Sequence, residues 1–135
     1  MAIRVRVQTG VHISSTSAEE RDLGSVEVEA VCDTQKDGGS WKITLAAGAT
    51  NVSAQLSELA ECRVLHLRTR PVNANDTPGT VTVKRNGTGA EAWPVEPLPT
   101  TKQGLLMITT SGLTALYLTN PGTVAMEVTV SAVGD

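Results

Sequence analysis

The stretch Val124-Ala-Met-Glu-Val-Thr-Val-Ser-Ala132 decides the fold class of this chain. Its apolar residues Met126, Val128 and Val130 occupy every second position, and polar residues lie between them. Successive side chains of a β-strand point to opposite faces, so this period of two predicts a strand with one buried and one solvent-exposed face.

The same alternation recurs along the rest of the 135 residues, and turn residues separate the alternating segments. Many short strands at near-regular spacing are typical of a sandwich or a barrel. We therefore predict a single domain over residues 1–135, an all-β two-sheet sandwich of jelly-roll type with about eight to ten strands. The other predicted strands are 3–8, 26–30, 41–45, 52–56, 63–69, 80–84, 105–109 and 113–118, and turns are predicted at Gly38–Gly39, 73–79, Asn86–Gly87, Ser111–Gly112 and 120–122.

The core of this sandwich must be aliphatic, because the chain has no Phe, two Trp and one Tyr. Val and Thr are abundant, and β-branched side chains suit a pleated, half-buried surface. Two segments with helical character, 17–20 and 57–61, are too short to form a helical layer. Five residues on the apolar faces of the predicted strands are expected to be buried: Leu67, Val83, Ile108, Leu116 and Val128.

Charge and hydropathy exclude two classes of partner. The net charge of −3 and a pI near 5.3 argue against a nucleic acid held through its phosphates, and the eleven Lys and Arg are scattered. No run of eighteen apolar residues predicts a membrane-spanning helix. The first residues alternate at once and have no apolar core of a signal peptide, so none is expected.

No catalytic or metal-binding motif stands out, and we expect neither an enzyme nor a cofactor. The chain has no Gly-x-Ser-x-Gly elbow and no His-x-His pair of the cupin type, and His12 and His66 lie inside alternating segments. Two cysteines cannot complete a zinc site by themselves. Cys32 and Cys62 are predicted to be buried thiols, with a disulfide between them as the alternative.

The segment Trp93-Pro-Val-Glu-Pro-Leu-Pro99 differs from the predicted strands around it because it contains three prolines. Proline cannot donate to a central ladder, so the segment is predicted to be an extended connector or a sheet edge. One interpretation is a crossover between the two sheets. The other is an arm that lies on a neighbouring subunit, with Trp93 and Leu98 as its contacts.

Arg4 and Arg6 on the first predicted strand are the other candidate contacts. Two residues two apart on a strand point the same way, at a separation of about 7 Å. They could therefore bind carboxylates of a partner through paired hydrogen bonds. Homo-oligomers are expected, formed through edge strands or an exchanged segment.

Five stretches of the C-terminal half share a pattern of short valine- and leucine-rich strands and Asn-Pro-Gly turn chemistry: Val64–Arg70, Thr80–Lys84, Gly104–Thr110, Leu113–Gly122 and Ala125–Val130. In these stretches the chain resembles small β-sandwich structural proteins of tailed bacteriophages, often jelly rolls. The resemblance implies a virion protein made in the host cytoplasm, namely a capsid cement (decoration) protein that binds the major capsid protein or other virion proteins. A small tail, collar or baseplate component is the first alternative.

A carbohydrate-binding sandwich is the second alternative from the same composition. Sugar-binding sites usually contain aromatic side chains on which the sugar rings stack. The whole chain has only three aromatic residues, which argues against such a site. An enzyme is the interpretation that the residues support least.

Overall fold

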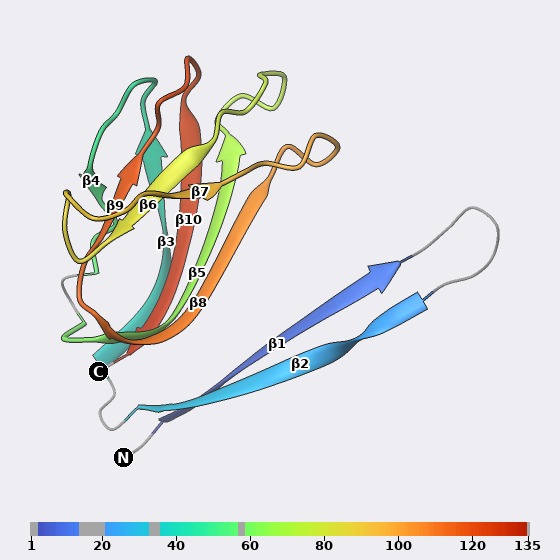
Figure 1. Ribbon diagram of the computed structural model, residues 1–135, viewed down its shortest axis with the longest axis vertical. Coiled ribbons are helices and arrows are strands. Elements are labelled where there is room, and N and C mark those ends of the chain that lie inside the picture. Colours follow the sequence, from blue (N-terminus) through green and yellow to red (C-terminus); the bar gives the residue numbers. More distant parts are fainter. Residues whose placement is uncertain (1–2, 14–20, 33–35, 57–58, 135) are drawn as a thin grey trace.

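The computed structural model describes the backbone of residues 3–13, 21–32, 36–56 and 59–134, and side chains from residue 39 onward within these ranges. The described part contains ten strands and no helix (Figure 1). The predicted helical segment 17–20 lies outside the described residues. The strands are β1 (Ile3–Ile13), β2 (Arg21–Cys32), β3 (Lys36–Leu45), β4 (Val52–Ser53), β5 (Cys62–Pro71), β6 (Val81–Arg85), β7 (Trp93–Val95), β8 (Gly104–Leu113), β9 (Leu116–Thr119) and β10 (Met126–Gly134).

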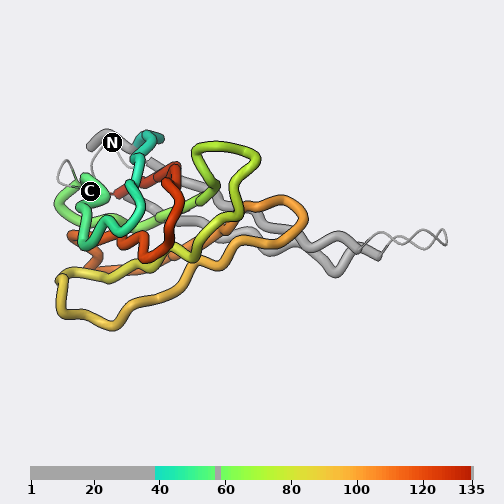
Figure 2. Tube along the Cα trace, turned by 90° about the horizontal axis from the view of Figure 1, so that it is seen from above, coloured from blue at the N-terminus to red at the C-terminus, as the bar shows by residue number. Residues whose placement is uncertain are grey.

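Eight of these strands form two four-stranded sheets, with the orders β3-β10-β5-β8 and β4-β9-β6-β7. The antiparallel pairs β3–β10, β4–β9, β5–β8 and β6–β7 are nested. The chain from β3 to β10 is therefore one long hairpin, with its apex between β6 and β7, rolled into two layers (Figures 1 and 2). This is the connectivity of an eight-stranded jelly roll, and the predicted two-sheet sandwich is confirmed.

The core lies between the two sheets and is aliphatic, as the composition requires. All five residues predicted to be buried are buried, and the most exposed of them, Ile108, exposes 9% of its surface. The pattern on β5 gives the reason: Leu65 and Leu67 point inward, whereas the alternating residues His66 and Arg68 are exposed and partly exposed, respectively. The predicted strand register is therefore correct for the core strands.

The predicted turn at Gly38–Gly39 is wrong. Strand β3 begins at Lys36 and runs through both glycines, and Gly39 pairs with Ala132 of β10. Glycine permits a turn but does not require one, and β10 provides a partner for an extended backbone at this point.

The predicted turn at Ser111–Gly112 is also wrong, because both residues lie within β8. Gly112 has a φ of 74°, and the register between β5 and β8 shifts here, so the glycine forms a bulge. The chain turns two residues later, at 114–115.

The predicted strand 52–56 is shortened to Val52–Ser53. Asn51 and Gln55 on either side of it have positive φ values of 52° and 61°, which end the extended backbone. The inward positions are nevertheless those predicted, since Ala54 and Leu56 are buried. The indole Nε1 of Trp41 donates to the carbonyl of Ala54 at 3.0 Å and holds the segment against β3.

Two asparagine side chains fix the loops that connect the sheets. Asn120 is fully buried, and its Nδ2 donates to the carbonyls of Leu45 (3.2 Å), Ala46 (3.1 Å) and Val124 (2.8 Å). Asn86 donates to the carbonyl of Gly112 at 2.7 Å. The predicted turns at 120–122 and 86–87 are thus confirmed, and their asparagines also bind distant strands.

Strands β1 and β2 pair with each other in a separate two-stranded sheet. Among the described strands, β1 and β2 are each other's only ladder partners, and neither joins the ladders of the sandwich. The two four-stranded sheets are formed by strands within residues 36–134. Figure 1 shows this hairpin beside the sandwich, on the side of β8.

Candidate partner-binding edge

The sandwich has one edge at which an irregular connector joins its two sheets. Strand β7 is the last strand of one sheet and β8 is the last strand of the other, and residues 96–103 connect them. This segment therefore crosses between the sheets, as the first interpretation of Trp93–Pro99 predicts. Pro94 pairs with Thr82 on β6 and lies on an edge strand, where proline is tolerated. We call β7, residues 96–103 and β8 the β7–β8 edge.

A glycine sets the position of the connector against the sandwich. A Cβ atom at Gly104 would lie 2.7 Å from Oγ1 of Thr69 and 3.1 Å from the carbonyl oxygen of Glu96. Both separations are shorter than ordinary contacts, so a residue larger than glycine would displace β5 or the connector. Gly104 thus permits the close approach of β8, β5 and the end of β7.

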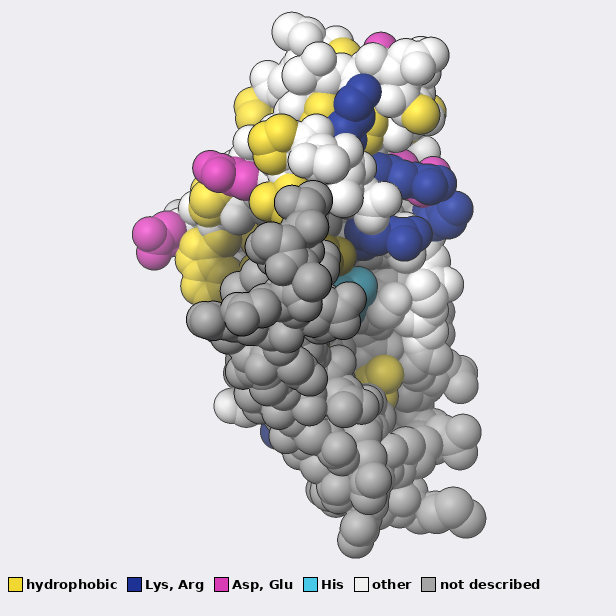
Figure 3. Space-filling view, turned by 90° about the vertical axis from the view of Figure 1, so that its right-hand side faces the viewer, with side chains coloured by type: hydrophobic (Ala, Val, Ile, Leu, Met, Phe, Trp, Pro, Cys, Tyr) yellow, Lys and Arg dark blue, Asp and Glu magenta, His cyan; other side chains and the backbone are white. Residues whose placement is uncertain are grey.

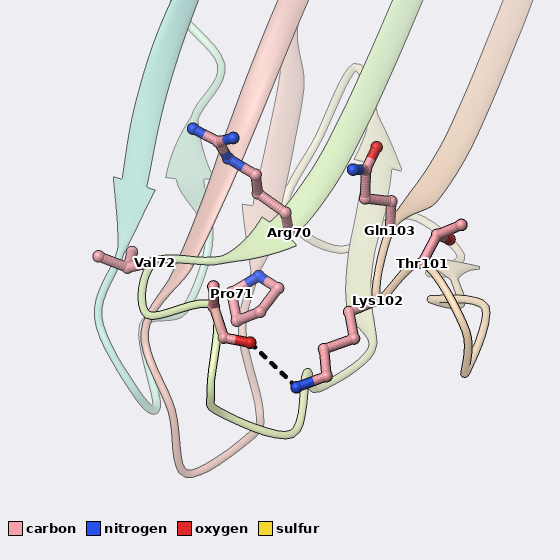
Figure 4. A pocket seen from close by; sticks show the side chains of 7 residues that line it. Arg70, Pro71, Val72, Thr101, Lys102 and Gln103 are labelled. Carbon is pink, nitrogen blue, oxygen red and sulfur yellow. Dashed lines mark hydrogen bonds between the residues drawn. The ribbon is translucent and has the colours of Figure 1, made fainter.

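The connector is held by hydrogen bonds at both ends of its turn. The amide of Leu98 donates to the carbonyl of Gln103 at 2.9 Å, and the amide of Lys102 donates to the carbonyl of Leu98 at 2.8 Å. The ammonium group of Lys102 also donates to the carbonyl of Ala74 at 3.0 Å (Figure 4). It donates to the carbonyl of Asp76, on the same 73–79 loop, at 3.2 Å. The side chain of Leu98 therefore projects from an ordered turn.

Two exposed leucines line one hollow of about 420 Å³ at this edge. Leu98 exposes 65% of its surface and Leu105 exposes 67%. Contiguous exposed apolar surface is typical of interaction sites. Leu98 is one of the contacts predicted from the sequence, whereas Leu105 was not predicted as one. The other residues that line the hollow are Glu96, Thr101 and Gln103.

The register of β8 explains why Leu105 faces solvent. Leu106 pairs with the buried Leu67, so Leu105 points the opposite way and pairs with Arg68. The next outward residue, Met107, is also exposed. The sequence signal is the unbroken run Leu105–Ile108: a strand that is apolar at every position must present apolar side chains on both faces.

Trp93 lies at the other end of β7. It exposes 37% of its surface and pairs with Val83, and the guanidinium carbon of Arg85 is 5.9 Å from the centre of its ring. Arg85 also donates to the hydroxyl of Thr110 on β8 at 2.9 Å, so it links the two sheets beside Trp93. Trp93 lines its own hollow of about 330 Å³, whose lining shares no residue with that of the leucine hollow.

Basic side chains follow the outer face of the sheet that contains β8. Lys42 of β3 and Arg68 of β5 both pair with Thr129, and Arg70 pairs with Glu127. Arg70 binds Oε1 of Glu127 through Nε and Nη2, both at 2.8 Å, and Lys42 lies 3.6 Å from the same oxygen. We call Lys42, Arg68 and Arg70 the basic strip. The closeness of Arg68 and Arg70 was visible in the sequence, whereas the third cation comes from a distant strand.

Several sequence-based predictions concern residues whose side chains lie outside the described part. These are the contact roles of Arg4 and Arg6, for which the structure gives only the backbone pairing with Val31 and Glu29, and the pairing of Cys32. Cys62 is fully buried as predicted, and its thiol donates to the carbonyl of Val64 at 3.3 Å.

The described residues contain no group of three or more His, Cys, Asp or Glu side chains placed to bind a metal ion. Within the same residues, no helix has the length and apolar character that a membrane crossing needs.

Comparison of the chain with protein-family models, with curated proteins and with solved structures gives no match.

Proposed function

We propose that this protein is a structural component of a virion and specifically a capsid-bound cement protein. The observation that carries the proposal is the ordered apolar surface at the β7–β8 edge, where Leu98 and Leu105 are about two-thirds exposed. An apolar surface held on a hydrogen-bonded turn loses little conformational entropy on docking. The resemblance of the C-terminal half to phage sandwich proteins supports the same function.

A cement protein needs a stable body and a docking surface rather than a deep pocket. The jelly roll gives the body, since its two sheets bury one continuous aliphatic core. The docking surface would contact the major capsid protein through Leu98 and Trp93, with Arg4 and Arg6 on the hairpin as further contacts. Because a shell presents many equivalent sites, modest contacts of this kind add by avidity.

The test is binding to undecorated shells by co-sedimentation, with Leu98→Ser and Trp93→Ala compared with the unchanged chain. Leu98→Ser should reduce binding roughly tenfold, because it removes most of one buried leucine from the contact. Trp93→Ala should also reduce binding, with a decrease in melting temperature because the ring packs beside Arg85 and Val83.

The matched control is Val72→Ser, which alters an exposed apolar residue (54% exposed) on the loop after β5. It should leave both binding and the melting temperature unchanged. Equal binding by the Leu98 variant and the unchanged chain would refute the proposed docking edge. Reproducible binding to a glycan array, without binding to shells, would instead favour the carbohydrate-binding function.

A further inference from the structure

The β7–β8 edge carries an apolar patch between charges of opposite sign. We call Leu98, Leu105 and Met107 the leucine patch; all three are exposed. On one side, Glu96 lines the same hollow as Leu98 and Leu105. On the other side, Arg68 is the cross-strand neighbour of Leu105 and begins the basic strip.

Figure 3 shows this order on one face of the molecule. Two acidic side chains project on the left of the view beside hydrophobic side chains, and most of the Lys and Arg side chains gather on the right, with acidic side chains among them. Glu96 and Glu91 are both exposed, and each lines a hollow of this edge: Glu96 with the leucines, Glu91 with Trp93.

We infer that a second copy of this chain occupies the leucine patch in a two-fold symmetric dimer. When two copies meet face to face, the two-fold axis lies in the interface plane. An axis parallel to β8 exchanges the acidic and basic sides of the patch. It therefore sets Glu96 of each copy opposite Arg68 of the other and brings the leucines together at the centre.

The charge pattern favours a second copy as the occupant, because the patch is complementary to itself. A two-fold interface uses the same surface twice, so each favourable contact occurs twice. An apolar centre with a charged rim is also the usual anatomy of a protein interface. The complementary axis is unique: a perpendicular axis in the same plane would set basic against basic and acidic against acidic side chains.

The dimer would form from the purified chain alone, so its test is separate from that of the proposed role in a virion. Because Leu98 belongs to both surfaces, a second copy and the capsid protein would compete for it, and the shell would bind the monomer. The test of the dimer uses two single charge reversals in the full-length chain, Glu96→Arg and Arg68→Glu. Each reversal places two like-charged pairs in its own homodimer. When the two variants are mixed, one copy carries a positive charge at both positions and the other carries a negative charge at both. Each of the two cross-axis pairs in this mixed dimer then joins opposite charges again.

The expected result in sedimentation velocity is a dimer for the unchanged chain. Each reversal alone should raise the dimer dissociation constant at least ~10-fold, and an equimolar mixture should dimerise within about threefold of the unchanged chain. Lys84→Glu is the matched control: it makes the same kind of charge reversal on the other sheet and should dimerise normally. Leu105→Asp should abolish the dimer in every mixture.

Thermal melts of each variant verify that the fold is intact, since all the altered side chains are at least partly exposed. A monomer across the micromolar range for the unchanged chain would overturn the inference. So would a dimer that resists both reversals, an assembly larger than a dimer, or single reversals that fail to recover on mixing.

Discussion

At the scale of single residues, the polar side chains that matter most are those that satisfy buried backbone. Asn120 exposes none of its surface, and its amide group donates to three backbone carbonyls. These are the carbonyls of Leu45 at the end of β3, of Ala46 directly after it, and of Val124 before β10. Its Oδ1 accepts from the amide of Gly122 at 3.1 Å. The sequence identifies Asn120 as a turn residue, but those three carbonyl partners depend on the tertiary fold.

Asn120→Ala should therefore destabilise the protein by about 2–4 kcal/mol, because buried carbonyl groups lose their donors. Urea unfolding followed by circular dichroism measures the change. Asn73→Ala is the control: Asn73 is exposed and its side chain accepts one local bond, from the amide of Asn75, so less than about 1 kcal/mol should be lost. Equal losses for both variants would show that burial at Asn120 contributes nothing.

At the scale of strands, alternation predicts which residues face inward more reliably than it predicts where strands end. Leu67, Val83 and Val128 are buried as expected because their neighbours are polar. The predicted strand ends are wrong at two glycines, because Gly39 continues β3 and Gly112 forms a bulge in β8. A glycine in a sequence permits several conformations, and the neighbouring strand selects one of them.

The candidate contact residues also differ in how far the sequence predicts them. Leu98 could be found from the sequence, because an apolar residue between prolines has no strand to bury it. Leu105 could not be distinguished from its apolar neighbours without the register against Arg68. The basic strip combines residues from β3 and β5, which pair with β10 rather than with each other. The sequence pattern within each strand therefore cannot predict that these basic residues lie on one face.

Gly104→Ala tests the close approach that positions the connector. The added methyl group would meet Thr69 Oγ1, Val95 Cγ1 (3.0 Å) and the Glu96 carbonyl, so about 1–3 kcal/mol of stability should be lost. Gly87→Ala is the matched control, because nothing lies within 4 Å of a Cβ atom at that position. The same urea titration compares the two, and a neutral Gly104→Ala would contradict the described packing of β8 on β5.

At the scale of the whole molecule, the chain combines a closed jelly roll with a separate hairpin and a β7–β8 edge bearing exposed leucines. The eight-stranded order follows from nested pairing around the β6–β7 turn, and strand count and alternation are sufficient to anticipate a sandwich. They do not determine that β1 and β2 pair outside it. The long alternating strands of the hairpin look the same in sequence as the strands of the sandwich.

The proposed cement function requires this protein to bind a viral shell in many copies. Quantitative mass spectrometry of purified particles from the source of this chain tests it most directly, with the major capsid protein as the internal standard. A cement protein predicts hundreds of copies per particle, all released together when the shell contacts are disrupted. About a dozen copies or fewer would indicate a tail or collar component, and absence from the particle would contradict the virion account altogether.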